Sequence, residues 1–192
     1  MRIVLPREPL QDGDLRLREW TDADIPAVAA ACGDPEIARW LDQVPQPYTE
    51  RDAREYIAST RRGWRDGTIS TFAIADRATD EPLGSISIHW LDPEQAVGEV
   101  GYWVTLEARG RGVATAAVLL IARWALETCG LERLQLRADV LNTASQRVAE
   151  KAGFHREGVL RSARHSPRQG RRVDFAIYSL LPGELDTPAT QF

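Results

Sequence analysis

The stretch of sequence that decides the fold is Gly98-Glu99-Val100-Gly101-Tyr102-Trp103-Val104-Thr105-Leu106-Glu107-Ala108-Arg109-Gly110-Arg111-Gly112-Val113-Ala114-Thr115. Its first part, 98–104, is rich in bulky and β-branched residues and predicts a strand. The segment 113–126 consists almost entirely of helix-forming or apolar residues and predicts a helix. Between them, Gly110 and Gly112 allow the backbone to turn tightly and to approach a ligand closely. Because the first N–H groups of the helix would point into this turn, the stretch predicts a phosphate site.

Composition places the chain among ordinary globular domains. It has 192 residues, 43% hydrophobic and 27% charged, which suits one soluble domain with a substantial core. The apolar run 113–126 contains Arg123 and is too short to span a bilayer, and no signal-peptide stretch precedes Pro6, so we expect a cytoplasmic protein. The net charge of −4 argues against nucleic-acid binding. Cys32 and Cys129 have no metal or redox spacing and are expected to be inert thiols.

The alternation of apolar and polar residues predicts a single α+β domain. Period-two segments predict about seven strands, at 15–20, 69–76, 83–90, 98–104, 134–140, 154–160 and 173–181. Capping residues and helical periodicity predict helices at 21–32, 35–41, 49–67, 113–128 and 142–153. Before the last strand, 164–172 is predicted as a polar connection. We expect an N-terminal lead-in over 1–13, the folded domain over 14–182 and a C-terminal tail over 183–192.

The glycine turn has four possible interpretations: three kinds of phosphate site and a turn that binds no ligand. A P-loop would need a lysine beside the glycine, and Lys151 lies elsewhere. A dinucleotide site would need a small residue three positions after Gly112, where Thr115 stands, and would place the glycines early in a repeated βαβ pattern. The third kind is an acyl-coenzyme A site. An exposed basic turn without a ligand is the alternative.

Two blocks of the sequence resemble one family. The stretch 99–115 resembles the cofactor-binding motif of the GNAT superfamily of N-acetyltransferases, with Arg109, Gly112 and Ala114 at its characteristic positions. The block 142–161 is similar to the RimJ/RimL branch, which contains the ribosomal-protein N-terminal acetyltransferases and their relatives. The resemblance extends over about the whole predicted domain. It departs from many relatives in lacking a proline just before the turn.

The resemblance implies a mixed sheet whose two central strands splay apart and leave a V-shaped slot for acetyl-CoA. The pantetheine arm would pair with the backbone of Trp103 and Val104, as an added strand does. The pyrophosphate would bind the amides and arginine side chains of the turn, formed by Arg109, Gly110, Arg111, Gly112, Val113, Ala114 and Thr115. On the opposite wall, Asn142 would hold the pantetheine arm and Ser145 would protonate the leaving thiolate. From the residues alone Asn142 is a helix N-cap, which is compatible with that role.

The acceptor chemistry requires a base. An amine attacks only in its neutral form, so another group has to take its proton. Glu99 is the expected base, because it begins the central strand where relatives place a carboxylate beside the acceptor. Asp139 and Glu157 are alternative carboxylates, and His89 is an alternative proton relay. The amide of Val104 would stabilise the oxyanion.

The resemblance therefore implies an enzyme that moves acetyl from acetyl-CoA to a primary amine in a ternary complex. A protein or peptide N-terminal α-amine is the leading acceptor class. A small amine, including an antibiotic, is the second, and a non-catalytic acyl-CoA-binding sensor domain is the alternative outside enzymology. The acceptor pocket is expected from residues 35–66 and 164–172. We expect no metal, no membrane binding and no direct nucleic-acid binding, and the residues leave a homodimer open.

Overall fold

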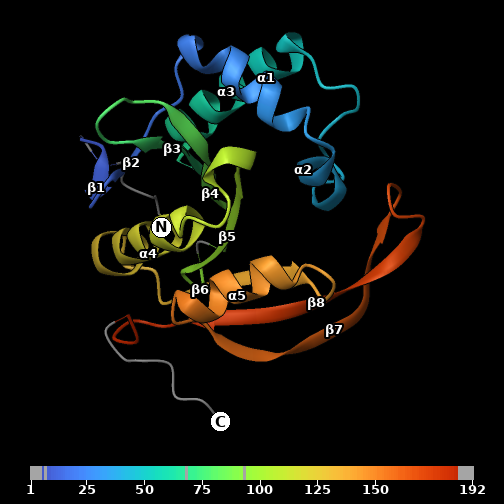
Figure 1. Cartoon of the computed structure of the whole chain (residues 1–192). Coiled ribbons are helices and arrows are strands. Elements are labelled where there is room, and N and C mark those ends of the chain that lie inside the picture. Colours follow the sequence, from blue (N-terminus) through green and yellow to red (C-terminus); the bar gives the residue numbers. More distant parts are fainter. Residues whose placement is uncertain (1–5, 7, 68, 93, 186–192) are drawn as a thin grey trace.

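One mixed β-sheet runs through the computed structural model, which describes residues 6, 8–67, 69–92 and 94–185 (Figure 1). Within these residues the sheet has eight strands in the order β1-β2-β3-β4-β5-β6-β8-β7. The strands are β1 (Leu10–Asp12), β2 (Leu15–Arg18), β3 (Ser70–Asp76), β4 (Pro82–Asp92), β5 (Val97–Val104), β6 (Arg133–Asp139), β7 (His155–Ser166) and β8 (Arg171–Leu180). Neighbouring strands are antiparallel except β5 and β6, which are parallel.

The helices begin and end largely where the capping residues predict. They are α1 (Ile25–Cys32), α2 (Pro35–Trp40), α3 (Glu50–Asp66), α4 (Val113–Arg123) and α5 (Thr143–Lys151), with short helical turns at Asp22–Asp24, Leu106–Ala108 and Trp124–Thr128. At the start of α3, Thr49 and Asp52 form a reciprocal capping box, and the helix ends at Gly67 with a left-handed φ of 64°. No helix in the described residues is long and apolar enough to cross a membrane.

Two segments differ from the prediction. Leu10–Asp12 lies in the expected lead-in but forms β1, which pairs with β2; three residues are too few to show a period-two pattern. The predicted connection 164–172 is shorter, because β7 continues to Ser166 and β8 begins at Arg171. As an edge strand, β7 is mostly exposed, so its outer half carries polar residues on both faces and gives no apolar signal.

Two cores lie on opposite faces of the sheet. On β3, Phe72 and Ile74 pack with α4 and its neighbours, whereas Ala73 between them faces α1 and α3. On that second face Trp20 and Ile57 are almost completely buried. In Figure 1, α1 and α3 lie together at the top of the view, while α4 and α5 lie nearer the middle of the sheet. Each large apolar side chain removed from water stabilises the fold by about 1.5–3 kcal/mol.

The central strands β5 and β6 pair over only three residues and then diverge, as the resemblance implies. The pairs are Val97 with Arg133, Gly98 with Leu134 and Glu99 with Gln135. Beyond Glu99, β5 continues to Val104 and is paired on its other side with β4. In the described residues the β6-facing edge of β5 therefore lacks a strand partner from 100 to 104. This opening in the sheet positions the site.

Candidate active site

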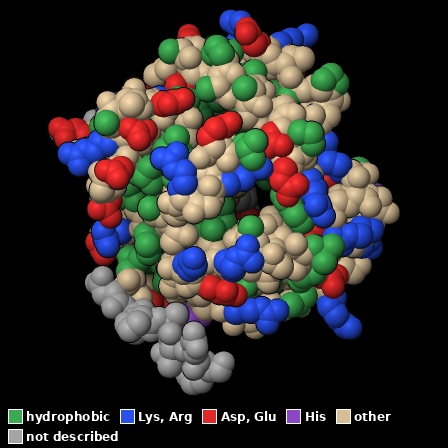
Figure 2. All heavy atoms as spheres, viewed as in Figure 1, with side chains coloured by type: hydrophobic (Ala, Val, Ile, Leu, Met, Phe, Trp, Pro, Cys, Tyr) green, Lys and Arg blue, Asp and Glu red, His purple; other side chains and the backbone are tan. Residues whose placement is uncertain are grey.

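A large cavity lies where β5 and β6 separate. Its volume is about 1460 Å³, and its walls come from β5, the start of α4, α5, α2, α3 and the hairpin of β7 and β8. Figure 2 has the same view as Figure 1 and shows the molecular surface hollowed near its middle. Ordinary small-molecule pockets have volumes of roughly 300–1,000 Å³, so this cavity has room for more than one ligand of that size.

The glycine turn presents an uncapped helix N-terminus to this cavity. Gly112 is the N-cap of α4 with φ 81°, and its helix has no side-chain cap. Gly110 also has a left-handed φ of 73°, and a Cβ placed on either glycine would meet no heavy atom within 4 Å. The first amides of α4 lack intrahelical acceptors, so they are available to an anion in the open space before them. The turn therefore fits the pyrophosphate expected from the sequence.

Most of the residues predicted for the site do line the cavity. They are Glu99, Trp103, Val104, Arg109, Gly110, Gly112, Val113, Ala114, Thr115, Asn142 and Ser145. Arg111 is the exception: it is exposed, is absent from the lining, and its guanidinium donates to the carbonyl oxygen of Glu107 at 3.4 Å. Arg109 lines the cavity but already donates to the Asp34 carboxylate at 2.5 Å.

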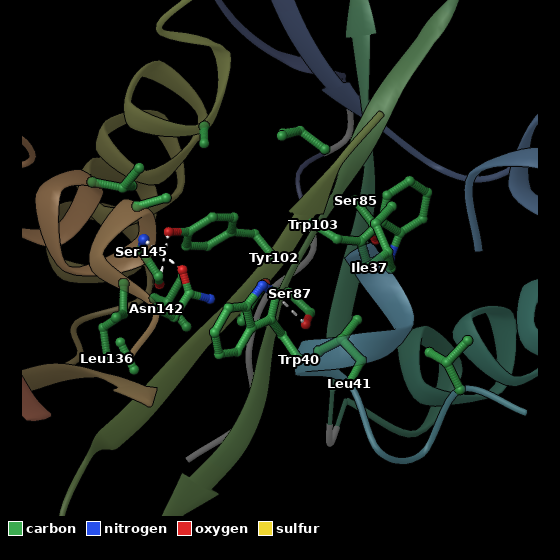
Figure 3. Close-up of a pocket in the computed structure, with 18 of the residues that line it drawn as sticks. Ile37, Trp40, Leu41, Ser85, Ser87, Tyr102, Trp103, Leu136, Asn142 and Ser145 are labelled. Atoms are coloured by element: carbon green, nitrogen blue, oxygen red, sulfur yellow. Dashed lines mark hydrogen bonds between the residues drawn. The ribbon is translucent and has the colours of Figure 1, made fainter. Parts of the chain in front are cut away.

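A hydrogen bond joins the two sides of the opening. The Tyr102 hydroxyl on β5 lies 3.0 Å from the Ser145 hydroxyl on α5, and Figure 3 shows the two side chains pointing towards each other. The Asn142 side chain caps α5 by accepting from the Ser145 amide at 3.0 Å, as its sequence position predicts. Burial raises the pKa of Tyr102 to about 12. Sequence reasoning overlooked Tyr102, although the period-two alternation places it on the same face of β5 as Val104.

Glu99 lies at the point of the fork and is held by polar side chains of β6. It is 4% exposed and accepts from Gln135 at 2.9 Å and from the Arg137 guanidinium at 2.6 and 2.8 Å. An ion pair with a guanidinium favours the ionised carboxylate. The signal for these two partners was present in the sequence, because Gln135 and Arg137 occupy alternate polar positions of β6.

Of the three alternative proton acceptors or relays, Asp139 lines the cavity, Glu157 does not, and the side chain of His89 is not described. Asp139 lines the cavity and accepts from Arg171 at 3.2 Å. Glu157 is absent from the lining; hydrogen bonds from Arg133 lower its pKa to about 2, against the opposing effect of burial. The side chain of His89 lies outside the described residues.

The other end of the cavity is walled by the two segments expected there. Ile37 and Trp40 of α2 face it in Figure 3. The loop after α2 is tied to the β7–β8 hairpin, since Asp42 accepts from Ser166 at 2.7 Å and pairs with Arg164 at 3.0 Å. Arg168 adds a bond of 2.6 Å to the same loop. In this way 35–66 and 164–172 form one wall.

Comparisons with known proteins agree on one family. The family model for the acetyltransferase (GNAT) domain matches residues 14–155. The "Putative ribosomal N-acetyltransferase YdaF" of Bacillus subtilis is 32% identical over 172 residues, covering 88% of this chain and 91% of that protein. The ribosomal-protein-serine acetyltransferase of Escherichia coli is 29% identical over 128 residues, covering 65% and 70% of the two chains.

Among solved structures, the ribosomal-protein α-N-acetyltransferase RimL, crystallised with coenzyme A, has a TM-score of 0.80 at 20% identity, with 91% of this chain and 98% of that chain covered. At this identity the likeness shows the shared fold. No group of side chains in the described residues is arranged to hold a metal ion. The chain belongs to the GNAT acetyltransferase family, in the RimJ/RimL-like branch, and is an acetyl-CoA-dependent N-acetyltransferase.

Proposed function

We propose that the chain acetylates the α-amine at the N-terminus of a protein or peptide, and that the amine attacks directly while acetyl-CoA is bound beside it. The observation that carries the proposal is the continuity of the cavity. It extends without a break from the Gly110–Thr115 turn to the walls formed by α2, α3 and the β7–β8 hairpin. A volume of about 1460 Å³ supports binding of a long co-substrate together with a second molecule.

One end of the cavity suits the co-substrate. The amides of the turn would bind the pyrophosphate, and the unpaired edge of β5 at Trp103 and Val104 would pair with the amide groups of the pantetheine arm. Asn142 lies across the slot from this edge, where it would help to hold the arm. When bound, acetyl-CoA supplies an activated acetyl group.

The residues around the reacting carbon have distinct tasks in this proposal. The Val104 amide donates to the carbonyl oxygen as that oxygen gains negative charge. The Ser145 hydroxyl gives its proton to the departing sulfur. Glu99, which pairs with Arg137, takes the proton that the amine loses.

The cost of deprotonating the amine supports an α-amine as the acceptor. Deprotonating an α-amine of pKa about 7.7–8 at neutral pH costs only about 1 kcal/mol, whereas a lysine-type amine of pKa about 10.4 needs about 4–5 kcal/mol. The names of the two curated relatives, which refer to ribosomal acetylation and to a ribosomal protein, support a protein acceptor.

The test is thiol release from acetyl-CoA in the presence of paired peptides. Each pair has one sequence containing an internal lysine, once with a free α-amine and once with a blocked N-terminus. We expect release with the free peptide and little with the blocked one. Release with both peptides, or with small amines alone, would assign another acceptor class. Tight acetyl-CoA binding without release from any amine would identify a sensor domain.

A further inference from the structure

The side chain of Tyr102 connects β5 to the proposed proton donor on α5. Its hydroxyl lies 3.0 Å from that of Ser145, and both residues line the cavity. We propose that Tyr102 is a positioning residue: it donates its hydrogen bond to Ser145 and thereby leaves the Ser145 proton free for the departing sulfur. The proposal rests on the role given to Ser145 and is independent of which amine is the acceptor.

The direction of this hydrogen bond decides what Ser145 can do. A serine hydroxyl has one proton and two acceptor sites, so a proton donated to Tyr102 would be unavailable to a ligand. A phenol is more acidic than an aliphatic alcohol and is the stronger donor of the two. Burial raises the pKa of Tyr102 to about 12, which keeps the phenol protonated, and therefore able to donate, throughout the neutral range.

The other hydrogen bond at this corner also constrains Ser145. Its backbone amide donates to the Asn142 side chain at 3.0 Å, which holds the first turn of α5 in place. With the backbone held by Asn142 and the hydroxyl oxygen held by Tyr102, the remaining freedom of Ser145 is the direction of its O–H bond. Acceptance from Tyr102 directs that bond away from Tyr102. Figure 3 shows the three side chains converging beside the slot.

Acetyl transfer forms one bond at the acetyl carbon and breaks another. The amine nitrogen forms a bond to the acetyl carbon and passes its proton to Glu99. The bond between the acetyl carbon and sulfur breaks with its electron pair on sulfur, and sulfur takes the Ser145 proton. As that proton moves, negative charge develops on the serine oxygen, and the Tyr102 hydrogen bond stabilises this charge more strongly than it stabilised the neutral hydroxyl. Solvent, which received the proton lost by the amine through Glu99, returns a proton to Ser145. Because the gain arises during bond breaking, it raises kcat and leaves KM almost unchanged.

Tyr178 offers a matched control. It is a buried tyrosine on β8 whose hydroxyl donates to Glu150 of α5 at 3.2 Å, so it too ties a strand to α5. It is absent from the cavity lining. Its hydroxyl also lies 3.4 Å from the Gln146 side chain. Tyr178→Phe thus removes a tyrosine hydroxyl that holds the same helix, while the hydrogen bonds of Ser145 to Tyr102 and Asn142 are kept.

The experiment compares steady-state kinetics of four variants with the amine that gives the highest rate. Tyr102→Phe is expected to lower kcat about 10- to 100-fold, with each KM within about threefold of the unmodified protein, and Tyr178→Phe to leave kcat unchanged. Ser145→Ala should lower kcat at least as much, and the double variant Tyr102→Phe with Ser145→Ala should be no slower than Ser145→Ala alone, because the two residues act as one unit.

Two outcomes overturn the proposal. If Tyr102→Phe retains full kcat, or slows the Ser145→Ala protein by the same factor as the unmodified one, Tyr102 acts only through packing. If Ser145→Ala retains full kcat, the proton-donor role of Ser145 fails and the inference fails with it. Failure of the acceptor assignment can be distinguished from these outcomes. It would change which peptide is acetylated, whereas the ratio of kcat between variants would stay the same.

Discussion

Arg109 donates to Asp34 at 2.5 Å, and this contact joins the turn before α4 to the N-cap of α2. The same arginine belongs to the proposed pyrophosphate site, and the same aspartate accepts from the Glu36 amide at 2.9 Å. Burial alone would raise the pKa of Asp34, but the bonds from Glu36 and Arg109 hold it below its usual value. The wall formed by α2 is thus linked to the co-substrate end.

Loss of the contact between Arg109 and Asp34 should weaken acceptor binding more than acetyl-CoA binding. Asp34→Asn keeps a cap for the Glu36 amide and removes the charge that pairs with Arg109. We expect a higher KM for the acceptor and an acetyl-CoA affinity that stays the same or improves, because Arg109 is released towards the phosphates. Asp34→Ala should in addition lose about 1 kcal/mol from the lost cap. An acceptor KM that is unchanged in both variants would show that α2 keeps its place without Arg109.

Gly112 should be required for acetyl-CoA binding more than for folding. At φ 81° an alanine costs about 1–2 kcal/mol, and its Cβ would project into the open space before the turn. Gly130 has φ 69° and equally open surroundings but is absent from the cavity lining, which makes Gly130→Ala a control for strain. Both variants should lose similar thermal stability, and only Gly112→Ala should lose acetyl-CoA affinity in calorimetry. Equal affinity in the two variants would contradict the phosphate assignment.

Gly84 should be intolerant of any side chain. A Cβ there would lie 2.3 Å from the carbonyl oxygen of Trp103, a backbone atom that is held in the pairing of β4 with β5. Gly84→Ala is expected to destabilise the fold by about 1–3 kcal/mol and to weaken acetyl-CoA binding, because it displaces the edge of β5. At Gly98 the tightest contact would be 2.9 Å to the side chain of Ile88, which can shift, so Gly98→Ala should cost less. Denaturant unfolding of both variants measures the difference, and a smaller loss at Gly84 would contradict this account.

Replacement of Glu99 should have its largest effect at low pH. There the amine is protonated and needs a base, whereas at high pH it is already neutral. Glu99→Gln should therefore lower kcat/KM most on the acidic side of the pH profile. Gln135→Ala is the control: it removes the hydrogen bond from Gln135 to the Glu99 carboxylate but leaves the negative charge of Glu99 in place. A uniform loss across the pH range would indicate a positioning role and assign the proton to solvent.

Glu157 should affect acid stability without affecting catalysis. Its pKa is lowered to about 2, first by Arg133 hydrogen bonds. A group with a lowered folded-state pKa stabilises the fold above its ordinary pKa, and the contribution is lost as the pH falls towards the lowered value. The difference in Tm between the unmodified protein and Glu157→Gln should hence be constant near neutrality and shrink as the pH falls from about 4.5 to about 2. Because the Glu157 side chain is 43% exposed, its ion pair should contribute little to the free energy of unfolding, under about 1 kcal/mol, and the difference in Tm should be correspondingly small. A change in kcat at neutral pH would contradict its separation from the cavity.

The elements that sequence reasoning located correctly carry local signals. The glycine turn follows from two glycines between a strand pattern and a helix pattern, and α3 from a capping box and a terminal glycine. The edge strands β1 and the outer half of β7 were missed, because a very short strand or one exposed on both faces has no period-two apolar pattern.

The sequence by itself determined the local geometry of the phosphate turn, the cap at Asn142 and the alternation that separates Tyr102 from Trp103, since each depends on residues within a few positions of one another. Only the tertiary structure decided that β5 and β6 part after Glu99, and that Arg109 meets Asp34, Arg137 meets Glu99 and Tyr102 meets Ser145. These pairs are 75, 38 and 43 positions apart, so their contact depends on how the sheet and helices pack around the cavity. A short-range pattern of residue types contains no information about that distance in space.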